Sequence, residues 1–361
     1  MNEIGQLRSL ADIGEKRLVG LILERLALPA IIVGGRGNDA TALDIGLEGS
    51  VLLVTTDRCP TPLAYKMDSS NVGIWGDLAI TCVASDLLAS GGRPTAFLVT
   101  LLLPQDLSGT DVLRLMRRAE ALANSLGAAI VAGDTKESSR LEVVTTGLAL
   151  APRHRLVRRC GARAGDLLVL TGQVGAFTAA HLAWKRGVAQ ADLASELLIP
   201  VLEPRPAYEA ATTLLLELEP KAGMDLSDGL LSTVFTLADL NCLGITIKES
   251  SLPISQAAVE VAHRFSVPPL RLAFGTGDWQ IAYAVDPDQW RELPPTSRAH
   301  RQLYPIGEFT SDAGVRLYGN DGRFRELCRI EQQHFAATSA DRSFLDHLLQ
   351  TSIFVESPQV C

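Results

Sequence analysis

The sequence predicts a protein of two domains, an N-terminal α/β domain followed by an α+β domain. Its 361 residues exceed what one hydrophobic core usually supports. Strand-like and helix-like apolar runs occur in both halves, which indicates layered α/β structure, and a basic, polar break at residues 152–159 separates the halves. We therefore expect an N-terminal domain over residues 1–152, a C-terminal domain over 153–318 and a polar extension over 319–361.

The N-terminal half contains three helical patterns and four strand patterns. In the helical runs apolar residues recur at helical spacing, and Gly91-Gly92 ends the second of them. The strand runs are short and apolar. We expect helices over 18–28, 74–90 and 109–126, a glycine-rich loop over 34–39, and strands over 51–55, 96–103, 128–132 and 142–150.

The C-terminal half opens with a strand, a turn and a helix. Strand 167–170 leads through a turn with two glycines, residues 171–175, into an apolar helix. The segment after residue 318 is polar apart from one helical pattern. We expect helices over 176–186, 205–218, 228–240 and 343–349, and further strands over 244–248, 279–285, 304–308 and 314–317.

The composition is that of a packed globular protein, with 47% hydrophobic residues and a mean hydropathy of +0.17. A net charge of −8 and a pI near 5.4 argue against a general nucleic-acid binder and against a binder of anionic membranes. An acidic protein that binds a polyanion such as ATP needs metal ions as intermediaries.

The cysteines and the N-terminus indicate a cytoplasmic protein. The N-terminus is charged and lacks the apolar segment of a secretory signal, and the longest apolar stretches, such as residues 97–103, are too short to cross a bilayer. No two cysteines form a C-x-x-C pair, so we expect reduced thiols at Cys59, Cys82, Cys160, Cys242, Cys328 and Cys361.

Five short segments each carry an aspartate beside a glycine or at the end of an apolar run. Apolar segments rarely carry carboxylates without a reason, and strand ends are rigid places to mount ligands. Singly, such an aspartate also suits a turn or a helix cap. If they converge, they form an oxygen-rich pocket suited to Mg²⁺ bridged to phosphates. The five are Asp39, Asp57, Asp86, Asp134 and Asp228.

Helix 74–90 carries two acidic residues, of which Asp86 is the functional candidate. Asp77 precedes it by nine residues, which puts the two on roughly opposite faces of the helix. Asp77 lies near the helix start, where the helix dipole favours a negative charge. Asp86 lies deep in the helix among apolar residues, where that explanation fails.

Three other segments offer contacts to phosphate. Ser227-Asp228-Gly229 opens helix 228–240, whose first amides suit a phosphate as well as they suit an ordinary cap. Asp225 either joins Asp228 or is the cap itself. The loop over 34–37 has little steric bulk and free amides, and Lys136 follows Asp134 as a point charge or as a solvated loop lysine.

The order of these motifs resembles that of the thiamine-monophosphate kinase family over residues 14–317. Residues 35–43 (GRGNDATAL) are similar to its G-x-G-D-D-A-A-V-L, and Thr56-Asp57 to its S-T-D. Residues 84–94 (ASDLLASGGRP) are similar to S-D-x-A-A-M-G-x-x-P, and Gly133-Asp134-Thr135 to G-G-D-T. Residues 225–230 (DLSDGL) are similar to the rather specific D-x-S-D-G-L.

The resemblance implies the two-domain ATP-binding fold of aminoimidazole ribonucleotide synthetase, with N-terminal strands that pair across a homodimer. It also implies an ATP- and Mg²⁺-dependent kinase that transfers a phosphoryl group to thiamine monophosphate. Carried over residue by residue, the metal ligands become Asp39, Asp57, Asp86, Asp134 and Asp228, with Asp134 and Asp228 catalytic. The nucleotide contacts become Gly37, Asn38, Thr56, Gly133, Thr135, Lys136 and Ser227.

Two departures from the family pattern point to a shifted acceptor. Asn38 replaces the first acid of the G-D-D motif, which removes one negative charge from the metal site. Residues 275–281 (GTGDWQI) stand where the family has G-G-E-D-Y-E-L, without either glutamate. Asp278 and Trp279 are the substrate candidates in this segment, because an indole can stack on a ring.

Two alternatives stay open at this stage. The first is an ATP-dependent dehydratase or synthetase, because Gly133-Asp134-Thr135-Lys136 and the final Pro358-Gln359-Val360-Cys361 are similar to motifs of the hydrogenase-maturation carbamoyl dehydratase, with Cys361 as carrier of the activated group. The second is a nucleotide-binding paralogue without turnover. Neither alternative involves a nucleic acid or a membrane.

Overall fold

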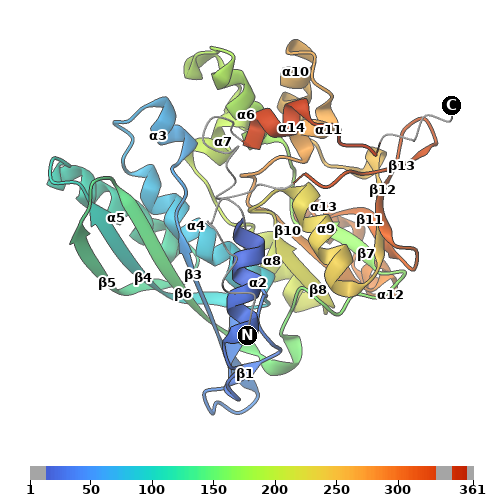
Figure 1. Ribbon diagram of the computed structural model, residues 1–361, viewed down its shortest axis with the longest axis horizontal. Coiled ribbons are helices and arrows are strands. Elements are labelled where there is room, and N and C mark those ends of the chain that lie inside the picture. Colours follow the sequence, from blue (N-terminus) through green and yellow to red (C-terminus); the bar gives the residue numbers. More distant parts are fainter. Residues whose placement is uncertain (1–13, 331–343, 356–361) are drawn as a thin grey trace, which may run out of the picture.

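The computed structural model describes residues 14–330 and 344–355, which form two β-sheets with helices around them (Figure 1). The first sheet is built from the N-terminal half and has the order β1-β2-β3-β6-β4-β5. Its pairs are antiparallel except β4–β5, which is parallel. Its strands are β1 (Ile32–Val33), β2 (Thr41–Leu43), β3 (Ser50–Arg58), β4 (Arg93–Leu103), β5 (Ala129–Glu137) and β6 (Glu142–Pro152).

The second sheet has the order β13-β12-β9-β11-β7-β10-β8. Only its β12–β9 pair is parallel. Its strands are β7 (Leu167–Leu170), β8 (Ala222–Asp225), β9 (Gly244–Lys248), β10 (Ile281–Val285), β11 (Tyr304–Thr310), β12 (Gly314–Tyr318) and β13 (Phe324–Glu326). This mixed two-sheet architecture confirms the expected α/β plus α+β class, whereas the boundary at residue 152 stays a prediction.

Helix α4 (Ile74–Ala89) joins the two sheets, because it packs against β3, β4 and β6 of the first and against β8 and β10 of the second. Almost all of its side chains are buried, as expected of a helix that is apolar all round. Near its end, the Tyr283 hydroxyl of β10 donates a 2.8 Å hydrogen bond to the carbonyl of Leu88. The last turn of α4 is therefore held between the two halves of the chain.

Asp77 has the structural role expected from its place in the first turn of α4. Its buried carboxylate accepts hydrogen bonds from the guanidinium of Arg118 on α5 (Gly109–Ser125), and Arg118 also donates to the carbonyl of Leu202. The ion pair thus ties both helices to α7 (Ser195–Leu202) of the C-terminal half. Asp86, the other carboxylate of α4, forms no salt bridge with any of the described residues.

The other helices surround the sheets and complete the core. α6, α7 and α10 contribute to the same apolar cluster as α4 and α5, so the core is continuous between the halves. Within residues 14–330 and 344–355, every helix is too short or too polar to cross a membrane. The remaining helices are α2 (Glu15–Arg25), α3 (Leu63–Met67), α6 (Ala176–Lys185), α8 (Tyr208–Glu217), α9 (Leu230–Asn241), α10 (Gln256–Arg264), α11 (Pro269–Ala273), α12 (Pro287–Glu292), α13 (Pro295–His300) and α14 (Phe344–Gln350).

Two differences from the sequence expectations bear on the site. Strand β8 was not expected, because its four residues have no β-branched side chain, and it makes Asp225 a strand end rather than a loop residue. The segment after residue 318 is also more than a polar extension. Strand β13 pairs with β12, and buried Leu327 and Ile353 join the core of the second sheet.

Candidate active site

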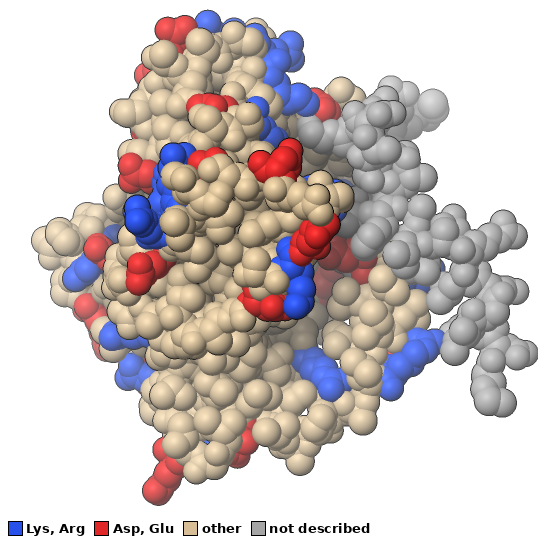
Figure 2. Space-filling view, turned by 90° about the vertical axis from the view of Figure 1, so that its left-hand side faces the viewer, with Lys and Arg blue, Asp and Glu red and all other residues tan. Residues whose placement is uncertain are grey.

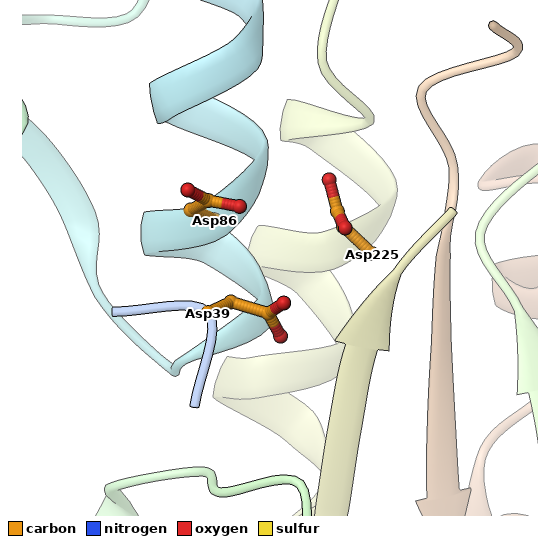
Figure 3. A group of neighbouring side chains, drawn as sticks. All are labelled: Asp39, Asp86 and Asp225. Atoms are coloured by element: carbon orange, nitrogen blue, oxygen red, sulfur yellow. The ribbon is translucent and has the colours of Figure 1, made fainter. Parts of the chain in front are cut away.

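Three carboxylates meet between the two sheets, as Figure 3 shows. Asp39 lies in the loop before β2, Asp86 in the last turn of α4 and Asp225 at the end of β8. One carboxylate oxygen from each lies within 4.8 Å of the others. Because the three come from both halves of the chain, the cluster exists only when the two sheets are packed together.

Asp86 and Asp39 are positioned by hydrogen bonds from neighbouring elements. The Thr55 hydroxyl of β3 donates to Oδ2 of Asp86 at 2.7 Å. The backbone amide of Ala40 donates to the Ser90 hydroxyl at the end of α4, at 2.9 Å. The loop that carries Asp39 is therefore fixed to the same helix end that carries Asp86.

Among the described residues, only one of the two carboxylate oxygens of Asp225 has a hydrogen-bond partner. The Ser227 hydroxyl donates to its Oδ1 at 2.8 Å, and the Thr233 hydroxyl donates to its backbone carbonyl at 2.9 Å. Its Oδ2 is buried and has no hydrogen-bond partner among the described residues. A buried, unsatisfied carboxylate oxygen is costly, so this atom is a ligand position that suits a cation.

The burial of these acids shifts their pKa values upward. Burial raises the pKa of Asp86 well above its usual range, and the charges of Asp225 and Asp39 raise it further. Burial, then the charge of Asp39, raises the pKa of Asp225 to about 7. Burial also raises the pKa of Asp39, against the opposing charge of Arg159. Such a cluster needs positive charge to ionise fully, and a divalent cation with oxygen ligands supplies it.

Asp57 and Asp228 lie at the rim of this cluster. Asp57 occupies β3 two residues after Thr55, so both side chains face the α4 side of the sheet. Desolvation raises the pKa of Asp57, and the negative charge of Asp228 adds to that rise. The charge of Asp57 in turn raises the pKa of Asp86. Four of the five aspartates expected to be metal ligands are therefore linked by electrostatic interactions, each with at least one of the others.

The expected nucleotide contacts of the two motif loops lie beside these acids. Ser227 is exposed and bonded to Asp225. Gly37 has a φ of 84°, a left-handed conformation that favours glycine. The Asn38 side-chain oxygen accepts the backbone amide of Arg159 at 3.0 Å. Thr56, another expected nucleotide contact, is not placed beside the acids: it faces the other side of β3, where its hydroxyl donates to the Thr145 carbonyl at 3.3 Å.

The described chain does not bring Asp134 to the other aspartates. Its strand β5 is the outer edge of the sheet, three strands and ~14 Å from β3. Asp57 pairs with Thr145, whose side chain is buried on the α4 side. Asp134 pairs with Thr100, and Thr100 pairs with Val144. Val144 is next to Thr145 in β6, so its side chain points to the opposite face of the sheet. Asp134 therefore faces away from α4.

The residues around Asp134 are exposed as well. The Thr135 amide donates to the Asp134 carboxylate at 2.8 Å, and the Lys136 ammonium lies 3.7 Å from it. Gly133 packs so closely on β4 that a Cβ there would lie 2.0 Å from the carbonyl oxygen of Val99. This four-residue segment is thus ordered and solvent-facing within one chain.

Asp278 and Trp279 line a cavity of about 760 Å³ beside α7 and α8. Both carboxylate oxygens of Asp278 accept amides at the start of α6, from Gly175 at 2.7 Å and from Phe177 at 3.0 Å. Asp278 therefore caps a helix, and its expected contact with a substrate stays a prediction. Trp279 is 7% exposed and has a φ of 51°, a strained value for a large side chain.

Gln280 completes this wall of the cavity. Its side chain accepts a hydrogen bond from the Thr171 hydroxyl at 3.1 Å and donates one to the Asp278 carbonyl at 3.0 Å. A glutamate could accept the first bond but could not donate the second. The glutamine is therefore adapted to the local hydrogen bonding of this chain.

Three contributors to the cluster were not among the expected site residues. Asp225 was left as either ligand or cap, and only the unexpected strand β8 decides its direction. Thr55 shares the face of Asp57 by strand alternation, a signal present in the sequence. Arg159 belongs to the basic break between the halves, and nothing in the sequence indicates that its guanidinium reaches Asp39 at 2.5 Å.

Comparison with known proteins supplies a family. Residues 37–151 match the family model of the AIR synthase related protein, N-terminal domain. The chain is 30% identical over 262 residues to the thiamine-monophosphate kinase of Pyrococcus abyssi, a match that covers 71% of this chain and 79% of that one. The chain belongs to the thiamine-monophosphate kinase family.

Solved structures share the fold of this thiamine-monophosphate kinase family member. AaThiL complexed with AMPPCP and TMP superposes with a TM-score of 0.78 at 23% identity, and the match covers 91% of this chain and 99% of that one. The hydrogenase maturation protein HypE of E. coli superposes with a TM-score of 0.62 at 24% identity, with 87% and 96% covered. The family model and the relative from Pyrococcus abyssi confirm the expected resemblance to the thiamine-monophosphate kinase family, and these structures show that the fold is shared.

Proposed function

We propose that this chain is an ATP- and Mg²⁺-dependent kinase that converts thiamine monophosphate and ATP into thiamine diphosphate and ADP. The observation that carries the proposal is the buried cluster of Asp39, Asp86 and Asp225, with one carboxylate oxygen left without a partner among the described residues. Its family relatives are named for this reaction, and AaThiL has been solved with AMPPCP and TMP.

The donor set of the cluster fits Mg²⁺. Hard divalent cations take carboxylate oxygens, and magnesium is usually held by few protein ligands together with substrate phosphates. Asp39, Asp86 and Asp225 would hold the ion, with Asp57 and Asp228 at the rim. The metal would neutralise the phosphate charge that builds up during transfer. The positions of the carboxylates would determine where the positive charge of the ion lies relative to the phosphates.

The residues around the cluster would position the phosphates. Gly229 has a φ of 87° and packs against the carbonyl of Gly275, so only glycine fits this entry to α9. No side chain of residues 14–330 or 344–355 caps the first turn of α9, and its amides therefore suit an anion. Ser227 at this helix start and Gly37 in the opposite loop are the nearest candidates for contact with the nucleotide.

A homodimer would explain the placement of Asp134. The face of the first sheet away from α4 carries apolar side chains, among them Val131 at 60% and Leu150 at 47% exposure. Figure 2 views the molecule from the side of β5 and shows mostly uncharged residues there, with charges scattered among them. If two copies pair through this face, Asp134 and Lys136 of one protomer would reach the site of its partner.

The cavity beside α7 and α8 is the candidate site for the acceptor. The indole of Trp279 forms part of its wall, and an aromatic wall suits a heterocyclic ring. Gln280 is uncharged where the family motif has a glutamate. The alternative of a dehydratase that uses Cys361 as carrier concerns a residue outside the described part of the chain.

The rim aspartates give a direct test of the nucleotide site. We expect Asp57→Asn and Asp228→Asn each to weaken Mg·ATP binding about tenfold or more, because each removes one charge that attracts the metal. The ligand-free melting temperature should change little, because neither side chain carries a structural ion pair among the described residues. Isothermal titration calorimetry measures the affinity, and exposed Asp106→Asn serves as a charge-matched control. Wild-type affinity in either variant would remove that residue from the metal site.

A further inference from the structure

Arg159 forms an ion pair with one of the three buried acids, Asp39. Its Nε and Nη2 atoms donate to Oδ1 of Asp39, at 3.2 and 2.5 Å. The Asp39 side chain is only 2% exposed and that of Arg159 25%. The negative charges of Asp39, Asp225 and Asp86 all act on this guanidinium. One arginine therefore offsets part of the charge of the whole cluster.

The backbone around Arg159 is fixed from both halves of the chain. Its amide donates to the side-chain oxygen of Asn38, in the loop that carries Asp39. Its carbonyl accepts a 2.9 Å hydrogen bond from the side chain of Asn241, at the end of α9. The same asparagine accepts the amides of Gly161 and Ala162. These contacts fix the backbone of the segment between the two halves, so that the arginine side chain points toward the acids.

The position of the guanidinium conflicts with a loaded metal site. A divalent ion bound by Asp39, Asp86 and Asp225 would lie within reach of the same Asp39 carboxylate that Arg159 engages. Two positive charges that share one carboxylate repel each other. With neither the metal ion nor Arg159 in place, the three ionised carboxylates, whose oxygens lie within 4.8 Å of one another, would repel each other.

We propose that Arg159 is an internal counter-ion that neutralises Asp39 while the site holds no metal and gives up this carboxylate when a divalent cation binds. The inference rests on the proposed Mg²⁺ site. It assigns Arg159 a role in positioning and charge balance rather than in chemistry. It also gives Asn38 a function in this chain, because its side chain anchors the arginine backbone at the position where the family motif has the first acid of G-D-D.

The test compares metal-free protein with protein titrated with Mn²⁺, a paramagnetic probe whose free concentration is measured by electron paramagnetic resonance. Arg159→Gln should melt at a lower temperature than wild type without metal. It should bind Mn²⁺ about tenfold more tightly, or about 1.4 kcal/mol. Exposed Arg158→Gln, which removes the same charge one residue earlier, should match wild type in both measurements.

Each other outcome contradicts a defined part of the proposal. If wild type binds Mn²⁺ and Arg159→Gln binds it equally or more weakly, the counter-ion role is wrong and the metal site stands. If neither protein binds Mn²⁺, the proposed metal site is wrong and the exchange fails with it. Should Arg159→Gln not fold, Arg159→Lys replaces it, since lysine keeps the charge but loses the forked hydrogen bonds. Its Mn²⁺ affinity should exceed that of wild type, and an equal or lower value overturns the counter-ion role.

Discussion

The Asp225→Asn variant is expected to lose phosphoryl transfer and to become more stable without metal. Loss of one ligand should lower kcat/KM at least about 100-fold, because charge compensation by a bound metal contributes several kcal/mol to transfer. The metal-free protein should gain stability, because one of three buried acids no longer repels the others. The asparagine amide also replaces the buried Oδ2 of Asp225, which has no partner among the described residues, by a group that can donate to a neighbouring carboxylate of the cluster.

Differential scanning calorimetry of the chelator-treated protein measures this gain. With about 1 kcal/mol per buried polar atom satisfied, the melting temperature should rise by roughly 1–2 °C. Asp106→Asn removes an exposed charge and should change neither activity nor melting temperature. A metal-free Asp225→Asn protein that is less stable than wild type would mean that Asp225 has a structural partner in solution and that the cluster is not a strained metal site.

The second large effect tests the proposal that two protomers share a site. Asp134→Asn and Asp225→Asn are each expected to be inactive as homodimers. If Asp134 serves the partner's site, a heterodimer of the two variants contains one site with both aspartates intact and one site with neither. Random assembly of equal amounts should then restore about one quarter of the wild-type activity.

Co-expression of the two differently tagged chains, followed by purification on both tags, measures this restoration. The selected heterodimers should show about half of the wild-type activity, since one of their two sites is intact. Activity at the level of the separate variants would place Asp134 in its own protomer's site or outside any site. A monomeric wild-type protein in analytical ultracentrifugation would remove the dimer proposal altogether.

Many helices and strands could be predicted from the sequence, because a strong pattern of apolar residues reflects which side chains are buried. Helix α4 was predicted from an apolar run that ends at two glycines, and the structure buries it on all sides. Strand β8 was not readable, since four residues without β-branching become a strand only through pairing with β10. Strand β5 extends past its expected end, which puts Asp134 within the strand rather than after it.

The candidate site was predicted in its residue types but not in its geometry. The aspartate motifs grouped Asp39 with Asp86, and the structure places the two close together, while their role as metal ligands stays a prediction. They did not reveal that Asp225 completes the cluster, or that Asp134 faces the opposite side of the sheet. Both depend on which strands pair and in which register, and pairing partners distant in sequence leave no local pattern. The contact between Arg159 and Asp39, 120 residues apart, is of the same kind.

The most direct test of the account is one incubation of the purified full chain with ATP, Mg²⁺ and thiamine monophosphate. Chromatography would follow thiamine diphosphate and ADP, with a chelator-treated sample as the control. We expect equimolar formation of both products, no turnover after chelation, and loss of turnover in Asp225→Asn. Binding of Mg·ATP without any thiamine diphosphate would contradict thiamine monophosphate as the acceptor, and thiamine diphosphate formation that persists after complete removal of metal would contradict the carboxylate–metal site itself.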